Sequence, residues 1–297
     1  MNALVQQFDA DMRLRDLSDM TRAQYTNCVA VFLRSDVQVD TLSGADIRAF
    51  LMRLLDTGRT PATVRLYGAA IKRWVRYTLE QPELVANLSL PQKRVTPPRP
   101  PLSPEELAAL LRACHGDALD YTLVSLLVGT GLRIAEAMRV QTGDIDGKTG
   151  ALLVRNGKGG KQRVVPLTRR LLAILRRYWV VARPPGPWLF PAVRRGQHRH
   201  LPAPDCFAAH PRSAATARKR IVRRGEQAGL PRRVLPHDLR RTFATTLLEA
   251  GTDMALVQRL LGHRNIETTA RYAQVRQRTL DGLRDTLEHV HRALAHR

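Results

Sequence analysis

A proline-rich stretch about a third of the way along the chain divides the sequence into two parts. Residues 91–106, PQKRVTPPRPPLSPEE, contain six prolines together with basic side chains. Proline lacks an amide hydrogen and has a fixed φ, so this stretch cannot continue a helix and is typical of a stiff, extended connector. We therefore expect a first domain at residues 1–90, a basic connector at 91–101 and a second domain at 102–297, which the length of the chain permits.

The first domain has the pattern of a helical bundle. Ser43 followed by Asp46 is typical of a helix N-cap with an acid in the first turn, and Thr60-Pro61 supplies an N-cap and a proline at the first helical position. Apolar residues follow both caps at helical spacing, and another amphipathic stretch covers residues 21–34.

The second domain is expected to be mainly α-helical with a small antiparallel β-sheet. Ser103 to Glu106 form a capping-box pattern that begins its first helix. Two short strands, 151–156 and 161–167, are joined by the glycine-rich turn Gly157-Lys158-Gly159-Gly160, which predicts a hairpin. The expected helices are 104–114, 118–140, 168–181, 213–228, 237–250, 253–261 and 276–295.

Charge indicates the partner. The chain carries 48 Lys and Arg against 26 Asp and Glu, a formal net charge of +22, and residues 183–241 alone hold 14 basic and 3 acidic side chains. So much positive charge repels itself unless a polyanion neutralises it, so nucleic acid is the expected partner. A merely arginine-rich composition would explain Arg over Lys but not the excess of base over acid.

Other features favour a cytoplasmic protein without a membrane span. The chain has no run of 18 apolar residues, and its start lacks the pattern of a secretory signal. Three widely separated cysteines, Cys28, Cys114 and Cys206, predict no disulfide framework.

Two apparent ligand motifs are weak. A phosphate-binding P-loop needs Ser or Thr directly after its lysine, at the start of a helix. Here Lys161 is followed by Gln162 and a predicted strand. The spacing of His198, His200, Cys206 and His210 matches no common zinc pattern, so we expect neither a metal nor a cofactor.

Two short motifs place cations in apolar or helical settings. In GTGLRIAEAMRV, Arg133 and Glu136 lie one turn apart among apolar residues, so Arg133 needs a compensating anion, either Glu136 or a ligand phosphate. In PHDLRRTFATTLLEAG, His237 and Arg240 lie on one face at the start of a helix. The helix dipole disfavours cations there, unless both side chains face an anion.

Taken with LLGHRNIETTARYAQV, which carries His263 and Tyr272, these motifs resemble the active-site set of the tyrosine recombinases, the family of the phage integrases and Xer recombinases. The matching strings, in chain order, are GTGLRIAE, NGKGGKQRVVPL, PHDLRRTFATTLLEAG and LLGHRNIETTARYAQV. The resemblance implies a helical N-terminal core-binding (SAM-like) domain and a C-terminal catalytic domain. Two departures are Arg241, where many relatives have His, and a long segment at 191–212.

The resemblance implies a role for each motif residue. Tyr272 is the expected nucleophile that forms a 3′-phosphotyrosine, and Lys158 the general acid for the leaving 5′ oxygen. His237 would be the base or proton shuttle for the tyrosine, and Glu136 a structural support. Arg133, Arg240 and His263 would bind the scissile phosphate.

The implied activity is site-specific cutting and rejoining of duplex DNA by a homotetramer, without metal or ATP. Whether this protein also requires a second recombinase or an accessory protein stays open. An amphipathic helix near residues 275–295 either packs on its own domain or docks on a neighbouring subunit. Two alternatives stay open: a type IB topoisomerase-like relaxing enzyme, and a catalytically silent DNA-binding relative.

Overall fold

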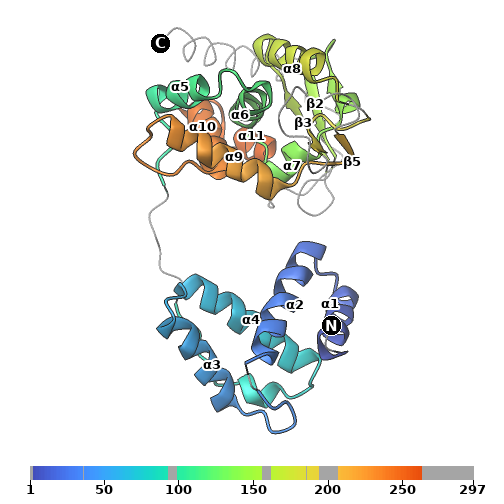
Figure 1. Ribbon diagram of the computed structural model, residues 1–297, viewed down its shortest axis with the longest axis vertical. Coiled ribbons are helices and arrows are strands. Elements are labelled where there is room, and N and C mark those ends of the chain that lie inside the picture. The colour runs from blue at the N-terminus through green and yellow to red at the C-terminus, as the bar shows by residue number, and fades with distance from the viewer. Residues whose placement is uncertain are drawn as a thin grey trace. The chain divides into compact units, whose positions relative to one another are not determined.

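The chain divides into two compact units, Met1–Pro97 and Pro98–Arg297, so the dividing line falls inside the expected connector. Figure 1 shows the helices and strands of both units. The computed structural model describes residues 3–35, 37–92, 99–155, 162–184, 186–193 and 207–262.

The first unit is a helical bundle, as its sequence predicts. Ser43 and Asp46 form a complete capping box, and the Thr60 side chain caps the following helix, which begins at Pro61. Phe32, Phe50 and Trp74 meet edge to face in the core. Its elements are α1 (Ala3–Leu14), α2 (Asp19–Leu33), α3 (Gly44–Asp56), α4 (Pro61–Tyr77) and a short 3-10 helix, η1 (Pro82–Val85).

The second unit packs its helices around α6 (Ala118–Thr130). This helix is apolar on every side and almost entirely buried, as an all-round apolar helix must be. The helices that surround it are α5 (Pro104–Ala113), α7 (Ile134–Met138), α8 (Arg169–Ala182), α9 (Ala214–Gln227) and α10 (Pro236–Glu249); α11 (Met254–Leu261) packs on α10.

The expectation of one helix over 118–140 is wrong, because the helix ends at Gly131. Gly131 ends α6 in the left-handed conformation, with φ at +64°. A β-carbon there would lie 2.4 Å from Phe243 and 2.9 Å from Leu261, so close packing also requires glycine. The break lets Arg133 begin a separate helix, α7.

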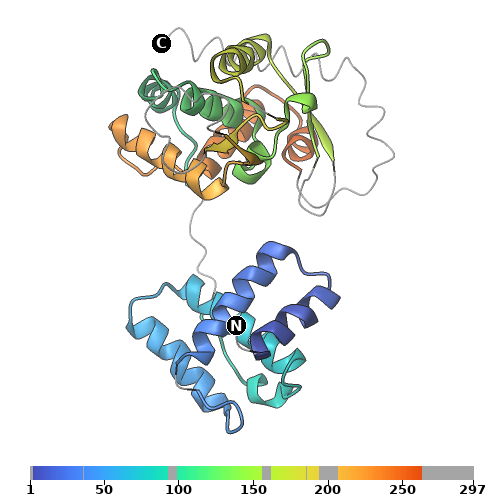
Figure 2. The ribbon, with the colours of Figure 1, turned by 45° about the vertical axis from the view of Figure 1, so that its right-hand side comes forward.

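The predicted hairpin is present, and the structure adds strands that the sequence did not reveal. Strands β2 (Ala151–Val154) and β3 (Arg163–Pro166) pair antiparallel, and β1 (Ile145–Asp146) extends the sheet on the other edge of β2. The hairpin lies on the side of the unit away from α5 (Figure 2). A second, two-stranded sheet joins β4 (Pro191–Val193) to β5 (Phe207–Pro211) within the long segment at 191–212.

The expected fold class, mainly α with a small antiparallel sheet, is thus confirmed. A further 3-10 helix, η2 (Thr142–Asp144), precedes β1. Among the described helices, none is both long and apolar enough to cross a bilayer. The helix expected at 276–295 lies outside the described residues.

Candidate active site

Arg133 and Glu136 form the first part of the candidate site, at the start of α7. The Arg133 backbone N–H donates to Glu136 Oε2 at 2.8 Å, and its Nη1 donates to Oε1 at 2.8 Å. Glu136 is the third residue of α7 and lies where a side chain folds back on the N-cap amide. The anion that balances Arg133 is therefore Glu136, one of the two that the sequence allowed.

Glu136 is buried and is shared with a second arginine. Arg163 on β3 donates from Nη1 to Oε1 at 3.1 Å and from Nη2 to Oε2 at 2.8 Å. Burial by itself would raise the pKa of Glu136. The hydrogen bonds and charges of Arg163 and Arg133 outweigh that effect and hold the pKa below its ordinary value. The carboxylate is therefore ionised and joins the start of α7 to β3, the second strand of the hairpin.

Arg240 enters the site from the second turn of α10. Its side chain is buried, and Nη1 donates to the carbonyl of Gly131, at the end of α6, at 2.7 Å. Burial, followed by repulsion from Arg133, lowers the pKa of Arg240 to about 10 despite attraction from Glu136. A guanidinium with this pKa keeps its proton at neutral pH, so Arg240 is a buried cation whose partners here are neutral carbonyls.

The end of α11 brings the three arginines together. The last carbonyls of a helix lack partners within it, and the negative end of the helix dipole favours cations there. Three consecutive carbonyls accept from three arginines of three other segments: Leu260 from Arg163 Nε at 2.7 Å, Leu261 from Arg240 Nη2, and Gly262 from Arg133 Nη2 at 3.3 Å. Arg133 and Arg240, which the sequence placed in separate motifs, therefore bind adjacent peptide groups.

His237 lies at the start of α10, one turn before Arg240, and is exposed. Partial burial of the imidazole, followed by repulsion from Arg240 and Arg241, lowers its pKa below the ordinary value, although Asp238 acts in the opposite direction. At neutral pH the imidazole is therefore mainly neutral, which is the form that can accept a proton.

The remaining motif residues, Lys158, His263 and Tyr272, lie outside the described residues, as do His198, His200 and Cys206. In the sequence Lys158 falls between β2 and β3, and His263 directly follows Gly262. In the part of the chain that is described, no cluster of three or more His, Cys, Asp or Glu side chains could hold a metal ion.

Sequence reasoning missed Arg163. Arg163 lies two residues before Val165 in β3, so both side chains are on the same, buried face of the strand. Only 7% of Arg163 is exposed. A signal was available, because an arginine two residues before a core valine in a short strand needs a buried anion. The partner, Glu136, comes from a motif that was singled out for Arg133 alone.

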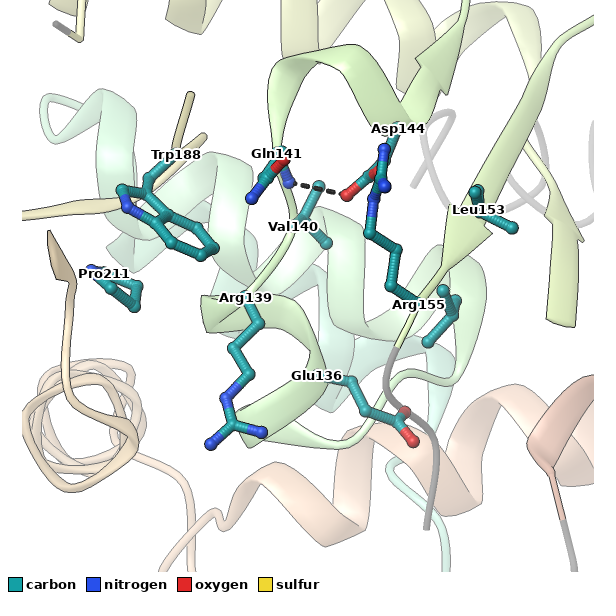
Figure 3. A pocket seen from close by; sticks show the side chains of 10 residues that line it. Glu136, Arg139, Val140, Gln141, Asp144, Leu153, Arg155, Trp188 and Pro211 are labelled. Carbon is teal, nitrogen blue, oxygen red and sulfur yellow. Dashed lines mark hydrogen bonds and ion pairs between the residues drawn. The ribbon is translucent and has the colours of Figure 1, made fainter. Parts of the chain in front are cut away.

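A small pocket of about 170 Å³ lies beside this network (Figure 3). Glu136 and Arg139 reach it from α7, Arg155 from the end of β2, and Trp188 from the segment before β4. Arg155 forms an ion pair with buried Asp144, which also accepts from the Gln141 amide at 2.9 Å. Two arginines, two carboxylates and an indole thus line the pocket together with apolar side chains.

Comparison with known proteins follows the same division of the chain. Residues 101–278 match the model of the phage integrase family, and residues 4–83 match the model of the phage integrase N-terminal SAM-like domain. The tyrosine recombinase XerA of Pyrococcus furiosus is 31% identical over 92% of this chain and 89% of its own length. An integrase/recombinase of Sinorhizobium fredii is 34% identical over 93% of this chain and 85% of its own.

Solved structures share the fold. A lambda integrase tetramer bound to a Holliday junction superposes with a TM-score of 0.69 at 18% identity, covering 90% of this chain and 79% of that one. At this identity the likeness concerns the fold alone.

Proposed function

The chain belongs to the phage integrase family and is a tyrosine-type site-specific DNA recombinase, and we propose that it cuts and rejoins duplex DNA through a 3′-phosphotyrosine at Tyr272. The resemblance of its motifs to this family is confirmed. The catalytic roles of individual residues are part of the proposal.

The observation that carries the proposal is the meeting of Arg133 and Arg240 at the end of α11. A guanidinium has five N–H donors; two on Arg240 are bound to carbonyls, which leaves three for a ligand. Two arginines fixed on adjacent peptide groups suit the non-bridging oxygens of one phosphodiester, because a planar fork binds two oxygens at once. Glu136 holds Arg133 in place without cancelling the net positive charge of the cluster.

In the proposed reaction the Tyr272 oxygen attacks the phosphorus while His237 takes the phenolic proton. The bond to the 5′ oxygen breaks, and Lys158 supplies the proton that makes it a 5′ hydroxyl. Arg133, Arg240 and His263 stabilise the charge that develops on the phosphate. A 5′ hydroxyl of the partner strand attacks the phosphotyrosine and releases Tyr272, so no ATP is needed to rejoin the strand. The arginines and the lysine take the charge-stabilising role that a metal ion would otherwise have.

Two other tyrosines in the second unit are poor nucleophiles. Burial raises the pKa of Tyr178 to about 12, so its phenol resists ionisation. Tyr121 lies in the first turn of α6, and Gly131, the residue that binds Arg240, ends the same helix. At 1.5 Å per residue the two are about 15 Å apart along the axis. These positions support Tyr272 as the nucleophile.

We further propose that duplex DNA is the partner and that a homotetramer acts on it. The net charge of +22 favours a polyanion. Lambda integrase, which shares the fold, has been solved as a tetramer on a Holliday junction. A second recombinase or accessory protein, and a cytoplasmic location, stay expectations from the sequence.

The test uses suicide DNA substrates that carry the recombination site and a nick that lets the cleaved strand diffuse away. Wild-type protein should form an adduct that survives a denaturing gel; Tyr272→Phe should form none, and Tyr121→Phe, a matched control, should form as much as wild type. An undiminished adduct with Tyr272→Phe contradicts the proposal. Relaxation of supercoiled plasmids without the site would favour the topoisomerase-like alternative, and DNA binding without any adduct the silent relative.

A further inference from the structure

The end of the connector is bound to α10, the helix that carries His237 and Arg240. Arg99 Nη1 contacts the buried carboxylate of Asp238 at 3.3 Å, and the Leu102 amide donates to Thr242 Oγ1 at 2.9 Å in a buried position. Arg241 Nη1 donates to the Arg99 carbonyl. Three of the first seven residues of α10 thus bind residues 99–102, at the start of the second unit.

Arg241 combines two properties at this junction. It lies four residues after His237, so both side chains share one face of α10. Its guanidinium therefore binds the connector and also places a cation one turn from the imidazole. The charged groups that act on His237 are Arg240, Arg241 and Asp238 of α10 itself and Arg133 at the start of α7.

We propose that Arg241 is a positioning residue for strand cleavage: by holding the Arg99 carbonyl, it fixes the end of the connector on α10, the helix that carries His237 and Arg240. This inference rests on the proposed function. An imidazole is shorter than a guanidinium and is largely uncharged at neutral pH. A histidine at 241 would therefore supply neither the reach to the carbonyl nor the permanent charge.

The experiment compares Arg241→Gln, Arg241→His and Arg241→Lys in the full-length chain, with Arg233→Gln as a control. Arg233 is exposed just before α10, and only its backbone carbonyl accepts from Arg99 Nη1, at 3.2 Å. Replacing its side chain therefore removes the same charge but leaves that carbonyl and the Arg241 contact in place. Hydrogen exchange of a peptide covering 99–103 reports this attachment, because Pro100 and Pro101 have no amide hydrogen and the Leu102 amide donates to Thr242 Oγ1. The Ser103 amide in the same peptide donates to Glu106 within the local capping box, which Arg241 does not touch.

Arg241→Gln and Arg241→His should speed exchange at Leu102, lower the cleavage rate at saturating suicide DNA roughly 10- to 100-fold, and move the acid limb of the pH profile upward. Arg241→Lys, which keeps the charge and a donor, should restore much of the rate. The control should leave exchange and the pH profile as in wild type.

Other results overturn the inference. Unchanged exchange at Leu102 in Arg241→Gln would mean that the tie does not depend on Arg241. Weaker DNA binding with a smaller salt dependence, but a normal rate at saturation, would make Arg241 a phosphate anchor. If wild-type protein forms no adduct, the proposed function fails, and exchange at Leu102 still tests the contact between Arg241 and the connector. Unchanged exchange in Arg241→Gln overturns that contact, and faster exchange supports it.

Discussion

Arg163 places both Nη atoms on the two carboxylate oxygens of Glu136, and the pair is buried between strand β3 and helix α7. Because Glu136 also binds Arg133, this pair connects β3, the second strand of the hairpin, to the arginine at the start of α7. The Arg163 Nε on Leu260 extends the connection to α11. Glu136 and Arg163 together therefore connect three segments of the candidate site.

Arg163→Met should destabilise the second unit strongly. It leaves the buried Glu136 carboxylate with one arginine instead of two, and breaking a buried pair from one side costs about 3–5 kcal/mol. Urea unfolding measures this change. Arg176→Met, which removes an exposed arginine from α8, should cost at most about 0.5 kcal/mol. Equal losses of unfolding free energy in the two variants would show that the buried ion pair contributes no more to stability than an exposed arginine does.

Arg240→Lys should abolish most cleavage while sparing DNA binding. Lysine keeps the charge but cannot bind the Gly131 and Leu261 carbonyls and a phosphate with one planar group. Loss of one preoriented charge stabiliser costs about 10²–10³-fold in rate. Single-turnover cleavage and gel shifts measure the two properties. If binding falls as much as cleavage, Arg240 serves mainly as a DNA anchor.

The pH profile of cleavage should have an acid limb with a midpoint below about 6.5, the ordinary pKa of histidine. Burial and the neighbouring arginines lower the pKa of His237, so the neutral base persists until the pH falls through that lowered value. Cleavage rates measured between pH 5 and 8 at saturating DNA test this. His237→Gln should be slow and should lose the limb; a midpoint above 6.5 in wild type would contradict the assignment.

Gly131→Ala should destabilise the second unit by roughly 2–4 kcal/mol, because the left-handed φ strains any β-carbon and that carbon meets Phe243 at 2.4 Å. Thermal unfolding measures the effect. Gly143→Ala is the matched control, since a β-carbon there meets nothing within 4 Å. Similar shifts in melting temperature for both would refute the packing argument.

Local sequence signals predicted much of this fold because they act over a few residues. The caps at Ser43, Thr60 and Ser103, and the hairpin, follow from side chains within four residues of the backbone they satisfy. The break at Gly131 was missed because apolar residues continue across it, and the close packing that requires glycine there involves Phe243, more than a hundred residues later.

The candidate site divides in the same way. Arg133 with Glu136 and His237 with Arg240 were found because each pair lies within one helical turn. Arg163 was missed because its partners come from distant segments, and a lone arginine in a strand carries no spacing signal. The ties of the connector to α10 depend on tertiary contact in the same way.

The most direct test of the central claim identifies the residue joined to DNA. The covalent adduct would be digested with trypsin and nuclease and analysed by mass spectrometry. Cleavage after Arg271 and Arg276 releases Tyr272 in the peptide YAQVR, distinct from those of the other five tyrosines. The account predicts a nucleotide remnant on Tyr272, linked through the 3′ phosphate. A remnant on any other residue, or a 5′ linkage, would contradict it.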